Sequence, residues 1–66
     1  MAMLYDMDNP IFSIGEQVIF KAFYFINVGI IKRIWYDDID KSWKYIVKIN
    51  KYGVNFVKSE RQIRKF

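Results

Sequence analysis

The clearest signal in the sequence is the alternation of apolar and polar side chains between residues 43 and 50. Every second residue from Trp43 to Ile49 is aromatic or a branched aliphatic. Successive side chains of a β-strand point to opposite faces of the sheet, so this period of two predicts a strand with one buried face. The opposite face is then formed by Lys44, Ile46, Lys48 and Asn50.

The stretch from Val28 to Tyr36 also has the character of a strand, but two adjacent charges interrupt its alternation. Strict alternation cannot leave both Lys32 and Arg33 in water and also bury the isoleucines on either side of them. One extra residue at Lys32–Arg33, a β-bulge, removes the conflict. The pattern therefore predicts a bulged central strand that points Ile31, Ile34 and Tyr36 inward and Ile30, Lys32, Arg33 and Trp35 outward.

Three shorter strands complete the prediction. The alternation over Gln17–Lys21 indicates a first strand that points Val18 and Phe20 inward. Residues 54–58 form a fourth strand, with Val54 and Phe56 inward, and Ile63–Phe66 a fifth. A single 3₁₀ turn is expected at Ser59–Gln62, directly before the last strand.

The segments between these strands are expected to be turns and one long loop. Ala22–Asn27 is interpreted as a long aromatic loop, because its aromatic and β-branched content and the lack of a cap disfavour the competing helix. Residues 37–42 form a polar hairpin loop, and Lys51–Gly53 a tight turn. Residues 1–12 are expected to form an N-terminal extension that is partly ordered from Pro10 onward, because Ile11 and Phe12 are costly to leave in water.

Five short strands with a late 3₁₀ turn predict an all-β fold, a small five-stranded SH3-like barrel over residues 13–66. The spacing of its glycines and apolar residues resembles that of Tudor, agenet and KOW-type small barrels. The resemblance implies binding to methylated peptides, RNA, ribosomal or polymerase surfaces, or partner subunits. The residues that carry it are Gly15-Glu16-Gln17-Val18, Gly29-Ile30-Ile31 followed by Ile34, Tyr45-Ile46-Val47, and Ile63-Arg64.

The composition argues against catalysis. The chain has no cysteine and no histidine, so it lacks thiolate metal ligands, the usual general base and a partner to activate its serines. The acidic loop that begins at Asp37 fails as an EF-hand, because Ser42 and Lys48 occupy the positions that require Gly and Glu. We therefore expect no enzymatic activity, cofactor, metal site or small-molecule substrate.

The charge is distributed unevenly. Residues 1–16 carry a net charge of −3, whereas residues 17–66 hold all eleven Lys and Arg against four acids, a net charge of +7. Such a basic body favours nucleic acid or an acidic protein surface, and it also serves solubility. The candidate nucleic-acid contacts are Lys32, Arg33, Lys44, Lys48, Lys51, Lys58, Arg61 and Arg64.

The chain is richer in apolar residues than one small core requires. Apolar residues make up 53% of the sequence and aromatic residues 20%, which leaves apolar surface for a partner. The Tudor resemblance adds the alternative of an aromatic cage for a methylated cation, formed from Tyr24, Phe25, Trp35, Tyr36 and Tyr52 with Asp37 or Asp38. The candidate partner-binding residues are Tyr24, Phe25, Ile30, Trp35, Ile46 and Tyr52.

The sequence as a whole predicts a non-catalytic binding module that contacts a protein partner, or a second copy of itself, through an aromatic and aliphatic surface. The alternative is RNA or DNA bound through the basic residues, with bases stacked on exposed aromatic rings. No apolar run is long enough to span a membrane and no signal peptide is recognisable, so a cytoplasmic location is expected.

Overall fold

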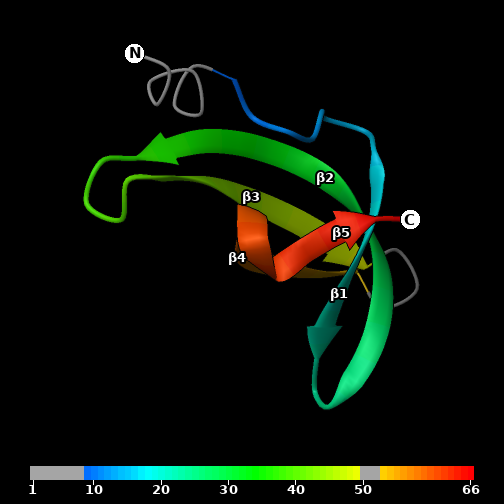
Figure 1. Ribbon diagram of the computed structural model, residues 1–66. Helices are drawn as coiled ribbons and strands as arrows, with labels where there is room; N and C mark the ends of the chain where they lie inside the picture. The colour runs from blue at the N-terminus through cyan, green and yellow to red at the C-terminus, as the bar shows by residue number, and fades with distance from the viewer. Residues whose placement is uncertain (1–8, 50–52) are drawn as a thin grey trace.

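The computed structural model describes residues 9–49 and 53–66, and it confirms the all-β prediction (Figure 1). Five antiparallel strands form one sheet in the order β4-β3-β2-β1-β5, and the predicted 3₁₀ turn η2 (Glu60–Gln62) precedes the last strand. The sheet is compatible with an SH3-like fold, but β4 and β5 remain its two edges, so it does not close. The strands are β1 (Gln17–Ala22), β2 (Phe25–Asp37), β3 (Ser42–Ile49), β4 (Val54–Ser59) and β5 (Ile63–Lys65).

The predicted bulge lies in β2, where two charged residues follow each other. Ile31 pairs with Val47, but the next pair is Arg33 with Ile46, so Lys32 is the extra residue. Lys32 and Arg33 are exposed and Ile31 is fully buried. The bulge restores the alternation on its far side, so apolar residues of both halves of β2 reach the same face of the sheet.

One face of the sheet, the inner face, carries the core. Tyr45, Ile31, Val18 and Val47 are fully buried there, and Ile34, Trp43 and Phe56 pack against the cluster at its margin. Val54 was also predicted to point inward, but it is 39% exposed because it begins β4, at the end of the sheet. The complete buried apolar set is Phe12, Val18, Phe20, Ile31, Tyr45, Val47, Ile49 and Ile63.

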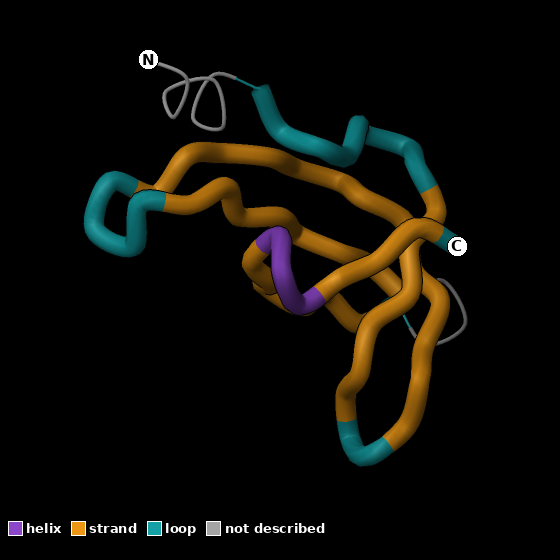
Figure 2. The backbone as a smooth tube through the Cα atoms, in the orientation of Figure 1, coloured by secondary structure: helices purple, strands orange, loops and turns teal. Residues whose placement is uncertain are grey.

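The predicted long loop at Ala22–Asn27 is wrong, because these residues belong to a tight β-hairpin. β1 continues to Ala22, which pairs with Phe25 at the start of β2, so only Phe23 and Tyr24 form the turn. β-Branched and aromatic residues favour extended backbone, and they extend both strands to the tip. The hairpin of β1 and β2 therefore projects beyond the rest of the sheet, as the backbone trace shows (Figure 2).

Side chains of the edge strand β4, rather than backbone hydrogen bonds, connect this strand to β1 and to the turn of the β1–β2 hairpin. The Phe56 ring packs against Phe20 and Phe23, with centroids 5.5 Å apart in each pair. Lys58 places its ammonium group 5.7 Å from the centroid of the Phe20 ring and donates a hydrogen bond to the carbonyl oxygen of Lys21 (3.2 Å). These contacts attach β4 to the hairpin.

The segment before β1 contributes to the core. Phe12 is buried and its ring packs edge-on against Tyr45, with centroids 5.6 Å apart. The Tyr45 hydroxyl donates a hydrogen bond to Oε2 of Glu60 (2.6 Å). Oε2 of Glu60 also accepts a hydrogen bond from the backbone N–H of Ile11 (2.8 Å). One carboxylate thus connects the N-terminal segment, β3 and the 3₁₀ turn. Residues 1–8 of the predicted extension, and Lys51 and Tyr52, lie outside the described residues.

Substitution of Gly29 by Ala should destabilise the fold by about 1–3 kcal/mol, because an added methyl group has no room in this part of the core. A Cβ atom at Gly29 would lie 2.6 Å from Val47 Cγ1 and 2.9 Å from the carbonyl oxygen of Lys48. Urea unfolding measures the change, and Asn55→Ala, at an exposed position of β4, is the control. Equal stability of Gly29→Ala and the parent chain would contradict this packing.

The stability of the protein should fall steeply above about pH 10, where the tyrosines of the unfolded chain ionise. Burial and the hydrogen bond to Glu60 raise the pKa of the Tyr45 phenol well above its usual value. The folded chain then holds a proton that the unfolded chain has lost, so increasing pH favours unfolding. Tyr45→Phe should flatten this dependence and cost about 1 kcal/mol at neutral pH. Tyr24→Phe, at an exposed site, should leave the pH profile unchanged.

Candidate interaction surface

The tip of the β1–β2 hairpin presents four adjacent apolar side chains to solvent. Phe23 is 68% exposed, Tyr24 95%, Phe25 70% and Ile26 68%. Phe23 packs edge-on against Phe56 of β4. Monomeric proteins rarely expose contiguous apolar residues of this size without using them, so this tip is the first candidate for an interaction site.

The backbone of the hairpin tip is strained. Phe23 has a φ of 54° and Tyr24 a φ of 68°, the left-handed conformation that a two-residue hairpin turn of type I′ requires at both positions. Such turns normally use Asn and Gly, because a side chain at positive φ costs of order 1 kcal/mol or more per residue. The two aromatic residues at these positions lower the stability of the fold, so their side chains are candidates for a functional role.

Aliphatic side chains also gather on the outer face of the sheet, the face opposite the core. The strand pairing brings Ile19 beside Val28, and Arg33 and Val57 to either side of Ile46. Of the predicted partner-binding residues, Ile30, Trp35 and Ile46 share this face and are half-buried. The sequence reasoning did not select Ile26 or Val57, both of which are exposed, because it assigned Ile26 to a loop and looked only at the inward residues of β4.

The predicted aromatic residues lie at two different ends of β2. Tyr24 and Phe25 are at the hairpin tip, whereas Trp35 and Tyr36 are at the opposite end of the strand, beside the β2–β3 turn. Tyr36 packs edge-on against Trp43 with ring centroids 5.3 Å apart. The Tyr36 hydroxyl and the Trp43 indole N–H are buried and find no hydrogen-bond partner among the described residues. The four described candidates for a cage therefore do not converge, and Tyr52 is outside the described residues.

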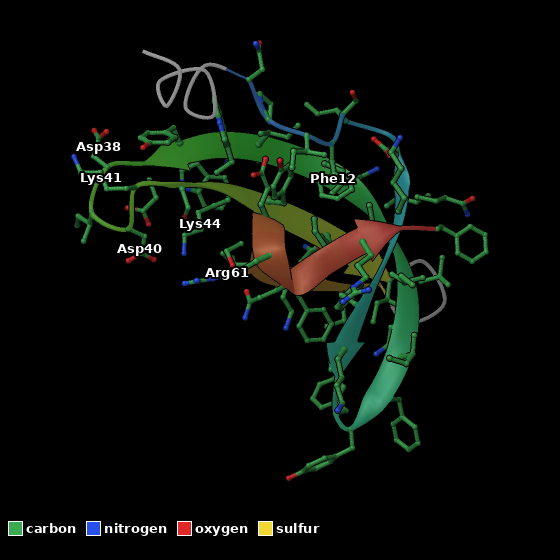
Figure 3. The ribbon with its side chains drawn as sticks, in the orientation of Figure 1. Phe12, Asp38, Asp40, Lys41, Lys44 and Arg61 are labelled. Atoms are coloured by element: carbon green, nitrogen blue, oxygen red, sulfur yellow. The ribbon has the colours of Figure 1, made fainter. Side chains whose placement is uncertain are left out.

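The basic residues are spread over several parts of the surface. Lys32 and Arg33 are exposed at the bulge, on the side of the sheet that also holds Lys48. Lys44 forms an ion pair with Asp40 (2.6 Å), and this hydrogen bond lowers the pKa of the Asp40 carboxyl. Figure 3 shows this pair with Asp38 and Lys41 at the β2–β3 turn. Two further candidates, Arg61 and Arg64, are exposed on η2 and β5, while Lys58 is held over aromatic rings.

A hollow of about 260 Å³ lies beside the hairpin, where β1 runs on beyond its partner β5. β5 pairs with Val18, Ile19 and Phe20 only, and the chain before Ile63 turns away as η2. The hairpin therefore has one uncovered flank next to the 3₁₀ turn. The hollow is lined by Ile19, Phe20, Lys21, Ile26, Gln62 and Arg64.

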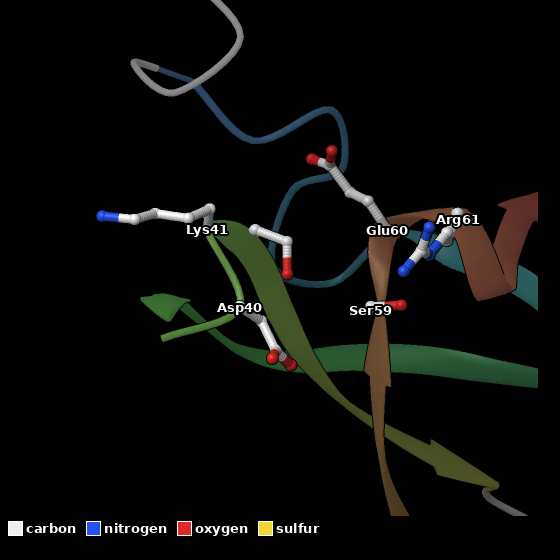
Figure 4. Close-up of a pocket in the computed structure, with 6 residues that line it drawn as sticks. Asp40, Lys41, Ser59, Glu60 and Arg61 are labelled. Atoms are coloured by element: carbon white, nitrogen blue, oxygen red, sulfur yellow. The ribbon is translucent and has the colours of Figure 1, made fainter. Parts of the chain in front are cut away.

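A second hollow, of about 270 Å³, separates the β2–β3 turn from η2 (Figure 4). Its charged groups are largely engaged: Asp40 pairs with Lys44, and Glu60 accepts hydrogen bonds from Tyr45 and Ile11. The Gln62 side-chain oxygen accepts the backbone N–H of Ser59 (2.9 Å), which caps the 3₁₀ turn, and it also accepts the Ser59 hydroxyl (3.2 Å). These contacts give the second hollow a structural role. Its lining is Asp40, Lys41, Ser42, Ser59, Glu60 and Arg61.

The described residues contain neither a cluster of metal-ligating side chains nor a membrane-spanning helix. Within residues 9–49 and 53–66, acidic side chains do not gather in a group of three that could hold a metal ion. In the same part of the chain, no helix has the length and apolar character needed to cross a membrane.

Tyr24→Gly should stabilise the protein by about 0.5–1 kcal/mol, because glycine adopts positive φ without strain and Tyr24 has almost no contacts to lose. Tyr24→Ala is the matched control, since it also removes the aromatic ring but keeps the strained Cβ. Urea unfolding of both variants measures the difference. If the two variants are equally stable, the turn does not hold the strain described above.

Comparison with known proteins leaves the description at the level of the fold. No known protein family, no curated protein and no solved structure matches this chain. The structure itself shows an open, five-stranded antiparallel sheet with an exposed aromatic hairpin tip.

Proposed function

We propose that this protein is a non-catalytic binding module that contacts another protein through the tip of the β1–β2 hairpin and the adjacent outer face of the sheet. The strained aromatic turn is the observation that carries the proposal. Phe23 and Tyr24 lower stability at positions where Asn and Gly would raise it. Residues that are unfavourable for folding are found where function requires them.

The outer face supports the same proposal. The large exposed or half-buried side chains Ile19, Ile26 and Val28 continue from the hairpin tip along the sheet. Aromatic residues are frequent anchors of protein interfaces, because they bury a large area and lose little conformational entropy. In this proposal Tyr24 and Phe25 are the anchors. Ile30, Trp35 and Ile46 extend the contact. The resemblance to Tudor, agenet and KOW-type barrels supports this proposal in so far as it implies binding to methylated peptides or partner subunits.

The alternative, binding of RNA or DNA by the basic residues, receives less support from the geometry. Lys44 is neutralised by Asp40, and Lys58 is held by two aromatic rings and a carbonyl oxygen. Lys32 and Arg33 are free to meet phosphate, but they lie on the bulge and not at the aromatic tip. A nucleic-acid site with stacked bases would need several cations and exposed rings side by side, and of the described candidates Arg64 borders the hairpin whereas Lys32 and Arg33 do not.

Photo-crosslinking in cells of the source organism tests the proposal. A benzophenone amino acid in place of Tyr24 should give a discrete adduct that protease destroys and nuclease does not. The same amino acid in place of Ile39 is the matched control, because Ile39 is also an apolar residue, 91% exposed, at the turn of a different hairpin. Adducts at both sites would indicate unspecific apolar contact, and adducts at neither site would contradict the proposal.

A nuclease-sensitive adduct would instead favour the nucleic-acid alternative. In that case affinity for mixed oligonucleotides should fall steeply with salt, because bound cations of the protein release counterions from the phosphate backbone. Lys32→Glu combined with Arg33→Glu should reduce this affinity further. A protein adduct together with salt-insensitive, weak oligonucleotide binding would exclude this alternative.

A further inference from the structure

The hollow beside the hairpin has a mixed apolar and polar lining, whose residues come from β1, β2, η2 and β5. Ile19 and Ile26 are cross-strand neighbours of Val28 and Lys21 on the outer face, and they provide aliphatic walls. Arg64 pairs directly with Ile19 from the other side and contributes to the lining of the hollow. Gln62 belongs to η2. An apolar floor with polar groups at the margin is the usual arrangement of a recognition site.

All charged residues around this hollow are basic. From Gln17 to Ile30 and from Gln62 to Phe66, the side chains that are charged at neutral pH are Lys21, Arg64 and Lys65, all of them basic. Among the described residues, Lys21 and Arg64 form no side-chain ion pair or hydrogen bond. Three acids, Asp37, Asp38 and Asp40, lie instead at the β2–β3 turn, away from the β1–β2 hairpin (Figure 3). The hollow therefore offers uncompensated positive charge.

The dimensions of the hollow suit a side chain rather than a larger molecule. Its volume of about 260 Å³ is smaller than the about 300–1,000 Å³ typical of pockets for drug-sized ligands and cofactors. Arg64 can form two parallel hydrogen bonds to one carboxylate, a geometry that Lys does not provide. One apolar side chain next to one carboxylate matches both parts of the lining.

We propose that the hollow receives an acidic segment of a partner protein, in which an aliphatic or aromatic side chain next to an Asp or Glu enters between Ile19 and Ile26. The carboxylate of that segment pairs with Arg64, and Lys21 adds a second positive charge. This inference depends on the proposed function, because it specifies the chemistry of the partner protein that binds the hairpin and the outer face. The exposed tip then packs on the partner beside the hollow.

Charge complementarity favours a different protein over a second copy of this chain. A symmetric dimer through this surface would oppose two patches that each carry Lys21 and Arg64, and like charges across an interface cost binding energy. An acidic partner would instead be attracted by the positive charge of Lys21 and Arg64. The same field speeds encounter with acidic surfaces at low salt.

Selection of random peptides against the immobilised chain tests this inference. The enriched peptides should contain Asp or Glu next to an aliphatic or aromatic residue. They are then synthesised with amidated C-termini, so that only side-chain carboxylates are offered, and their affinity is measured by fluorescence polarisation. Arg64→Glu should weaken binding tenfold or more, whereas Arg61→Glu, the same charge change on the exposed side of η2, should change it little.

A charge swap distinguishes a direct contact from a loss of folding. Peptides in which Lys replaces the selected acid should bind the Arg64→Glu variant better than they bind the parent chain, which a misfolded variant would not do. Failure to enrich acidic peptides, equal effects of the two arginine substitutions, or a dimer that Arg64→Glu dissociates would each overturn the inference. A protein adduct at position 24 that persists in Arg64→Glu would overturn it while leaving the proposed function in place.

Discussion

The pairing of β2 with two neighbours at once is the constraint on which the rest of the structure depends. Its first half pairs with β1 and its second half with β3, and both halves must point apolar residues at one core. The bulge at Lys32 makes this possible, because one unpaired residue reverses the alternation. Without it, Ile34 and Tyr36 would face water. Gly29 of β2 lets the side chains of Val47 and Phe20 approach the backbone closely, because this position has no Cβ atom.

The open sheet leaves the β1–β2 hairpin partly uncovered. β5 has three residues and pairs with Val18, Ile19 and Phe20 of β1, whereas Phe56 and Lys58 of β4 reach β1 through their side chains. The hairpin therefore stands free on one flank. Its uncovered flank becomes the hollow, and its tip becomes the exposed aromatic cluster. The hollow and the exposed tip thus both follow from the short β5, which covers only part of β1.

Stability and the proposed interaction compete at the hairpin. The core, the Glu60 contacts to Tyr45 and Ile11, and the bulge all favour one folded state. The turn at Phe23 and Tyr24 acts against it, through positive φ and through apolar exposure. A small domain has a low free energy of unfolding, so a destabilising turn is best explained by a function of its side chains. The acids of the β2–β3 turn lie beside Lys41 and Lys44, whereas Lys21 and Arg64 carry the charge at the hollow next to the hairpin.

Local patterns determined the strands, the bulge and the 3₁₀ turn, because the period of two and the Lys32–Arg33 interruption are properties of neighbouring residues. The same reasoning placed Ile30, Trp35 and Ile46 on the outer face, and the structure agrees. The two-residue turn was not predictable in this way: Phe23 and Tyr24 carry no turn signal, and their positive φ is imposed by the pairing of Ala22 with Phe25. The open edge, the hollow and the meeting of Arg64 with Ile19 also required the tertiary structure, since residues distant in the chain become neighbours only when β5 returns to β1.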